Sequence, residues 1–193
     1  WKTALLFVAC FLALHLVYIL VAWVASWFVS SSKPLGKQSS LCRNACVYAS
    51  YLVTGYCWVR THVRGAEKLP EAERFLMVSN HRSGFDPIII TRELRRFNIS
   101  FVSKPSNMEM PVLGHIGYCA GCLPIDREND RKALTTILTA ADYLKRNLCS
   151  MAIYPEGTRS KSDQLLPFHA GSFKIAQKAN VPLVISSIRG SER

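Results

Sequence analysis

The chain has 193 residues, enough for one domain with a hydrophobic core, and its formal net charge is +11. This charge fits either nucleic acid or an anionic membrane with anionic substrates as the partner. The seven cysteines are odd in number, which disfavours a disulfide framework and favours buried free thiols in a reducing compartment. Cys119 and Cys122 have the spacing of half a zinc site, but no second such pair accompanies them, so we predict no metal.

The amino-terminal segment is strongly apolar. Residues Thr3 to Val29 include no Asp, Glu, Lys or Arg, and at ~1.5 Å per residue such a helix can cross a hydrocarbon core of about 30 Å. A polar break over 30–36 separates it from a second apolar stretch, Leu41 to Val59. The two stretches fit a hairpin that enters one leaflet, or one spanning helix followed by a helix on the surface. Residues 1–60 are therefore predicted to form a helical membrane anchor.

Basic residues flank the first apolar segment unevenly. Lys33, Lys37 and Arg43 follow it, whereas only Lys2 precedes it. By the positive-inside rule, the domain that follows is predicted to lie on the cytoplasmic side of the cell membrane. This segment and the lack of a nucleic-acid-binding motif favour the membrane, and not nucleic acid, as the partner of the positive charge.

Residues 61–193 change to short apolar runs that alternate with helical patterns. The helix predicted over Arg131 to Arg146 is the clearest, because apolar residues recur in it every three or four positions. This alternation predicts an α/β domain with a mostly parallel sheet flanked by helices. The other predicted helices are Asp86–Phe97 and Ser172–Lys178, and the predicted strands are Phe75–Ser79, Ile99–Ser103, Cys122–Ile125, Ser150–Tyr154 and Val181–Ile185.

Two polar motifs directly follow predicted strands, where folds of this class place their sites. In the first, Asn80 to Asp86, His81 is suited to act as a general base, and Asp86 could accept a hydrogen bond from the other ring nitrogen. The alternative is a surface histidine, with Asp86 capping the helix that starts before Pro87. The chain has no G-x-S-x-G motif, and Ser83 lacks that context, so we expect an acceptor hydroxyl to attack directly without an acyl-enzyme.

Three cations follow predicted strands at the same end of the sheet. Arg159 lies in the second motif, Pro155 to Ser160, and a guanidinium there can hold a phosphate through two parallel hydrogen bonds. Lys104 and Arg127 follow two other strands. Each alone fits an ordinary surface charge, and the alternative for Arg159 is a turn in which it pairs with Glu156 or with water. Together they predict a site for an anionic group.

The motifs in this order resemble those of the glycerolipid acyltransferases that make phosphatidic acid from lysophosphatidic acid, chiefly the bacterial branch. The resemblance runs from about Arg74 to Ile188. Its four blocks are Asn80-His81 with Asp86-Pro87; Lys104, Pro111, Gly114, Gly121 and Ile125-Asp126-Arg127; Tyr154 to Ser160 with Phe168 and Gly171; and Val181-Pro182.

The resemblance implies a role for each of these residues. His81 would be the general base and Asp86 its partner, while Lys104, Arg127, Glu156, Gly157, Thr158 and Arg159 would bind the phosphate and glycerol of the acceptor. The implied reaction moves a fatty acyl group from acyl-CoA or acyl carrier protein to the sn-2 hydroxyl of lysophosphatidic acid at a membrane. No metal or prosthetic group is implied.

The sequence departs from the family pattern at Pro105-Ser106-Asn107, where another basic residue is expected after Lys104. The chain also stops soon after the fourth block, so we expect an α/β domain truncated at its carboxyl end. A related acyltransferase that uses glycerol-3-phosphate or another lysophospholipid is the nearest alternative. A non-catalytic basic membrane-binding protein is a more distant one.

Overall fold

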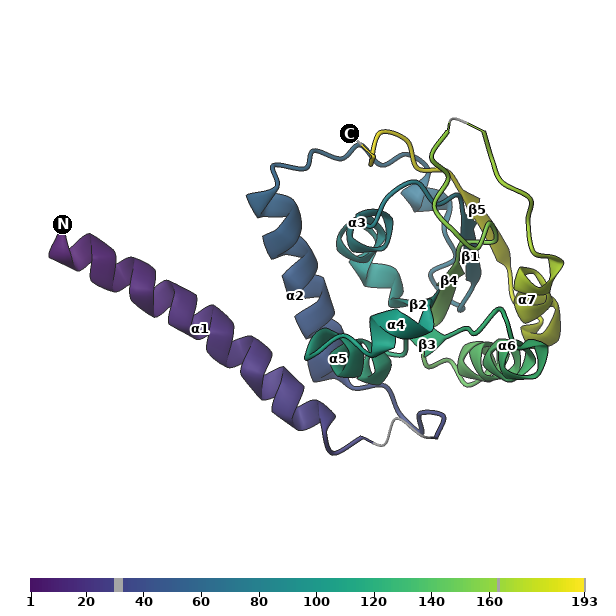
Figure 1. The fold of residues 1–193 in the computed structure, drawn as a ribbon, viewed down its shortest axis with the longest axis horizontal. Coiled ribbons are helices and arrows are strands. Elements are labelled where there is room, and N and C mark those ends of the chain that lie inside the picture. Colours follow the sequence, from purple (N-terminus) through teal and green to yellow (C-terminus); the bar gives the residue numbers. More distant parts are fainter. Residues whose placement is uncertain (30–32, 163, 193) are drawn as a thin grey trace.

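The computed structural model describes residues 1–29, 33–162 and 164–192, and it is built around one parallel β-sheet (Figure 1). The five strands lie in the order β3-β2-β4-β1-β5, and each of the four neighbouring pairs is parallel. The predicted α/β class with a mostly parallel sheet is confirmed. The strands are β1 Leu76–Ser79, β2 Ile99–Ser103, β3 Leu123–Pro124, β4 Ser150–Ile153 and β5 Leu183–Ser186.

Helices cover both faces of the sheet (Figure 1). α3 (Asp86–Glu93) lies on one face, and α6 (Asp130–Lys145) and α7 (Lys174–Ala179) pack together on the other. The side chains of β1 alternate between these faces: Met77 packs in the cluster that contains Ile90 of α3, and Leu76 packs in the cluster that contains Ile137 of α6. Burying apolar side chains on both faces is what fixes the register of a parallel sheet.

The two polar motifs follow strands that are neighbours in the sheet. β1 pairs with β4, and Val78 lies opposite Ile153. Because parallel strands end at the same edge, the loop after β1 and the loop after β4 lie side by side although 75 positions separate His81 from Glu156 in the chain. This pairing, and not sequence distance, places the candidate residues in one site.

Several boundaries differ from the predicted ones. The helix predicted to reach Phe97 is α-helical only to Glu93; a 3-10 helix, Arg95–Phe97, follows and ends at Asn98 in the left-handed conformation with φ of 50°. β3 is only two residues long, and directly after it the N–H of Ile125 still donates to Ser103 O of β2 at 2.8 Å. The remaining elements, which the sequence reading did not predict, are α4 Pro105–Met108, α5 Leu113–Cys119 and the 3-10 helices Ala66–Lys68 and Ala170–Ser172.

The amino-terminal part forms two helices that differ in their surroundings. α1 (Lys2–Ser26) is long and apolar enough to cross a membrane, and most of its side chains are exposed. Its last turns contact the domain, where Ser26 Oγ lies 2.8 Å from His115 Nδ1. α2 (Ser40–Tyr56) runs back along α1 and packs against α3 and α5 (Figure 1). The predicted polar break over 30–36 lies partly outside the described residues.

β5 is the outer strand of the sheet on one side. It pairs with β1 through Leu183 to Ser186. Its side chains are less covered than those of the central strands, and Ile185 is 80% exposed.

Candidate active site

His81 and Asp86 form a hydrogen-bonded pair at the carboxyl end of β1. His81 Nδ1 lies 2.8 Å from Asp86 Oδ2, and the carboxylate is fully buried. The same oxygen accepts hydrogen bonds from the backbone N–H groups of Arg82 at 2.7 Å and Ser83 at 2.9 Å. Asp86 is the first residue of α3 and does not cap it; its carboxylate instead holds the loop that carries His81. The capping alternative is therefore wrong.

The surroundings of Asp86 keep it ionised. Burial alone would raise its pKa, but hydrogen bonds from His81 and from the amides of Ser83 and Arg82 outweigh burial, so the pKa lies below its ordinary value. An ionised carboxylate at Nδ1 places the ring proton on that nitrogen and stabilises the imidazolium form. Nε2 is then the ring nitrogen that can accept a proton, and the His81 side chain is 20% exposed, so a substrate can reach it.

The ring of Tyr154 packs against the imidazole of His81. The rings of His81 and Tyr154 stack with centroids 4.1 Å apart and an interplanar angle of 13°, and the ring of Phe101 of β2 stacks with that of Tyr154 with centroids 6.4 Å apart. Burial, with the nearby charge of Asp86, raises the pKa of Tyr154 well above its ordinary value, so the phenol stays neutral. The sequence alone assigned Tyr154 no role, because a residue at the end of a predicted buried strand is expected to belong to the hydrophobic core.

Glu156 ties the two motif loops together. Its Oε1 accepts the backbone N–H of His81 at 2.8 Å, and its Oε2 accepts the backbone N–H of Leu166 at 2.9 Å. The residue is only 4% exposed. Both carboxylate oxygens thus accept hydrogen bonds from the protein backbone, and the bond to the His81 amide holds His81 in place.

The cations gather around the two glycines of the motifs. Arg159 NH1 lies 3.8 Å from the point that a Cβ on Gly84 would occupy, so its guanidinium is beside the His81 loop. Arg127 NH1 and His169 Nε2 each lie 3.0 Å from the corresponding point on Gly157. Gly157 has φ of +76°, so any side chain there would be strained, and its Cβ would crowd both groups unless they moved slightly.

The remaining predicted residues lie at the same edge of the sheet. Lys104 follows β2 and is exposed, and Thr158 is exposed between Gly157 and Arg159. The sequence reading missed His169, although it stands between two positions of the third block, Phe168 and Gly171. A histidine in a loop has no periodic pattern that would single it out.

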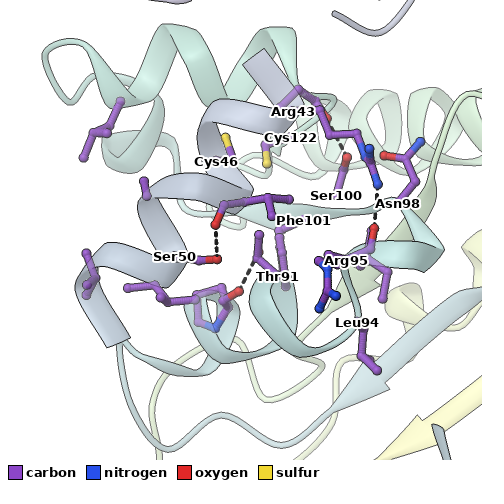
Figure 2. A pocket seen from close by; sticks show the side chains of 18 residues that line it. Arg43, Cys46, Ser50, Thr91, Leu94, Arg95, Asn98, Ser100, Phe101 and Cys122 are labelled. Atoms are coloured by element: carbon purple, nitrogen blue, oxygen red, sulfur yellow. Dashed lines mark hydrogen bonds between the residues drawn. The ribbon is translucent and has the colours of Figure 1, made fainter. Parts of the chain in front are cut away.

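A cavity of about 260 Å³ lies between α2, α3 and β2 (Figure 2). Pro87 and Ile88, which directly follow Asp86, line it, as does Phe101, which stacks on Tyr154. The cavity therefore begins one ring away from His81. Figure 2 shows Cys46 and Cys122 side by side in its wall, with Ser50 and Thr91 nearby; most of its other walls are apolar, including Val47, Val53 and Leu113.

Among the described residues, no group of three or more His, Cys, Asp or Glu side chains could hold a metal ion. Cys119 is buried and Cys122 is half-buried, and both are free thiols. The site as described therefore offers acid–base and hydrogen-bonding groups, together with positive charge.

A family model described as Acyltransferase matches residues 60–189. Among curated relatives, a chloroplastic 1-acyl-sn-glycerol-3-phosphate acyltransferase from Brassica napus is 33% identical over 137 residues, which are 70% of this chain and 39% of that protein. The enzyme of the same name from Escherichia coli is 33% identical over 109 residues, covering 56% of this chain and 44% of the relative. The beta form from Homo sapiens is 32% identical over 126 residues, which are 65% of this chain and 45% of that protein.

A crystal structure of the 1-acyl-sn-glycerophosphate acyltransferase from Thermotoga maritima has the same fold, with a TM-score of 0.68 and 22% identity. The similarity covers 97% of this chain and 75% of that one. The chain spans about half or less of the length of the three curated relatives.

Proposed function

Because the chain belongs to the acyltransferase family, whose model spans residues 60–189, we propose that it transfers a fatty acyl group from a thioester to the sn-2 hydroxyl of lysophosphatidic acid. The observation that carries this proposal is the His81–Asp86 pair, at 2.8 Å, with Arg159 beside its loop and Arg127 beside the neighbouring one. A base and a phosphate clamp at one edge suit an acceptor that carries both a hydroxyl and a phosphate. The curated relatives described above are named for this acceptor.

The proposed reaction is a direct displacement. His81 Nε2 takes the proton of the acceptor hydroxyl while its oxygen attacks the thioester carbonyl, so that a C–O bond forms and the C–S bond breaks. The imidazolium then gives that proton to the leaving thiolate, and a free thiol departs. Asp86 stabilises the imidazolium between these two steps, and Tyr154 keeps the ring in its plane.

The two substrates would approach from different sides of His81. Arg127, Arg159 and Lys104 would bind the acceptor phosphate, because planar guanidinium groups match phosphate oxygens. The apolar cavity that begins at Pro87 and Phe101 would receive the acyl chain, since burying methylene groups there stabilises the bound donor. The donor would be acyl-CoA or acyl carrier protein.

The protein would work at a membrane, with its domain on the cytoplasmic side of the cell membrane. α1 is apolar over most of its length and most of its side chains are exposed, which suits a lipid surrounding, and the net charge of +11 suits an anionic lipid surface. Acceptor and product are both lipids, so they would already be present in that surface.

A single-turnover assay tests the proposal. The purified protein is mixed with acyl-CoA or acyl carrier protein and with lysophosphatidic acid, glycerol-3-phosphate or lysophosphatidylcholine in turn. We expect phosphatidic acid as the dominant product, formed about 10² to 10⁴ times more slowly by a His81→Ala variant. Transfer to glycerol-3-phosphate alone would contradict the proposed acceptor, and no transfer with any pair would contradict the proposed activity.

A further inference from the structure

His169 stands opposite Arg127 across the backbone of Gly157. The ring Nε2 of His169 and NH1 of Arg127 each lie 3.0 Å from the same point above that glycine, so the two nitrogens are at most about 6 Å apart. The backbone N–H of His169 donates to Pro155 O at 2.9 Å, which fixes this residue beside the loop after β4. Its side chain is exposed, as is that of Arg127.

We propose that His169 is a specificity residue for the acceptor, and that it forms with Arg127 a clamp whose grip on a phosphate monoester strengthens as the imidazole takes up a proton. This inference rests on the proposed function and deepens it. A phosphate in front of Gly157 can reach both nitrogens, since two of its oxygens can each accept a hydrogen bond of about 2.8 Å from donors that lie about 6 Å or less apart. Gly157 leaves that space open because it has no side chain.

A phosphate that contacts the imidazole of His169 favours the protonated ring, because opposite charges attract. Arg127, which comes from the segment after β3, and Arg159, two residues after Gly157, supply further positive charge to the same phosphate. Glu156 turns its carboxylate to the amides of His81 and Leu166. Binding of the phosphate and uptake of a proton therefore favour each other. Imidazole is the side chain whose charge changes between about pH 5 and 8.

The test measures the acceptor KM and kcat from pH 5.5 to 8.5 for the native protein and for His169→Gln and His169→Lys. We expect the Gln variant to have an acceptor KM about tenfold above that of the native protein at pH 5.5, with the two converging toward pH 8.5. The Lys variant, always charged, should keep a low KM at pH 8.5. The pH profile of kcat should be the same in all three proteins.

The acceptor phosphate also titrates in this range, so the readout is the ratio of each variant to the native protein at the same pH. His62→Gln is the matched control, because His62 is exposed in a different loop, and its ratio should stay at one. A KM for His169→Gln within twofold of the native value at every pH would overturn the inference. Equal KM values for the Gln and Lys variants at pH 8.5 would also overturn it.

Binding without a donor separates this inference from the proposed function. Titration calorimetry with lysophosphatidic acid at pH 6 should show about tenfold weaker binding for His169→Gln, accompanied by loss of proton uptake measured in buffers of different ionisation enthalpy. If the native protein shows this linkage but no acyl transfer, the proposed function fails and the clamp stands. If acyl transfer is normal and the linkage is unchanged in the variant, the clamp fails and the function stands.

Discussion

Replacement of Glu156 by glutamine tests whether this residue holds the His81 loop or binds the acceptor. The two side chains have nearly the same shape, but the amide has one oxygen and one NH2 group where the carboxylate has two oxygens. In the native protein both oxygens accept backbone N–H groups, at 2.8 Å from His81 and 2.9 Å from Leu166. In Glu156→Gln one of these amides must face another donor.

The size of the effect follows from these contacts. A hydrogen bond to a charged group contributes about 1.5–3 kcal/mol, and a buried N–H left without a partner costs about 1–3 kcal/mol. Glu156 is 4% exposed, so water can restore little of this loss. Allowing for relaxation of the loop, we expect Glu156→Gln to lower the free energy of unfolding by about 2–4 kcal/mol, or the Tm by about 5–15 °C. Turnover should fall with it, because the His81 amide is one of the two that are affected.

The assay is thermal unfolding of the protein in detergent, followed by acyl-transfer kinetics well below the transition. Glu67→Gln is the control, because Glu67 is exposed and its substitution should change neither quantity measurably. An unchanged Tm together with a raised acceptor KM would refute the reasoning, and would instead make Glu156 a ligand of the acceptor glycerol.

Three further predictions concern the dyad and the phosphate site. His81→Ala should reduce turnover by about 10² to 10⁴, the usual contribution of a general base, with little change in acceptor KM; near-normal turnover in a folded variant would exclude the mechanism. Arg159→Lys keeps the charge but loses the planar fork, so the KM for a phosphorylated acceptor should rise about tenfold; an equal rise for a phosphate-free acceptor would argue against a phosphate contact. Asp86 has a lowered pKa in the folded protein, so its ionised form stabilises the fold above about pH 4, and this contribution is lost as the pH falls through the folded value. The difference in Tm between the native protein and Asp86→Asn should therefore be largest near pH 7 and should become smaller as the pH falls toward 3. A difference that does not depend on pH would contradict the assigned ionisation.

The sheet could be predicted because its signal is local. Short buried runs such as those ending at Ser79 and Ile153 are apolar on both faces, which is typical of central parallel strands. α6 could be predicted because its apolar residues repeat every three or four positions. α4 and α5 could not, because helices of four and seven residues are too short to show a period.

The sequence predicted which residue types form the site, but not which of these residues contact one another. The motifs identified His81, Asp86 and Arg159 by residue type and by position after a strand. The sequence could not show that β4 lies next to β1, and it is this neighbourhood that lets Glu156 bind the His81 amide. Nor could the sequence show that Tyr154 stacks on His81 or that His169 lies beside Gly157 opposite Arg127.

The exposed outer strand has a practical consequence for handling the protein. Among the described residues β5 pairs with a strand on one side only, and the side chain of Ile185 is exposed beside its other edge. Such an edge can pair with an extended segment of another molecule, so we expect purified samples to self-associate as the concentration rises. Lysine at position 185 would place a charge where a second strand would have to dock. That substitution is the first one to introduce when samples aggregate during crystallisation or spectroscopy.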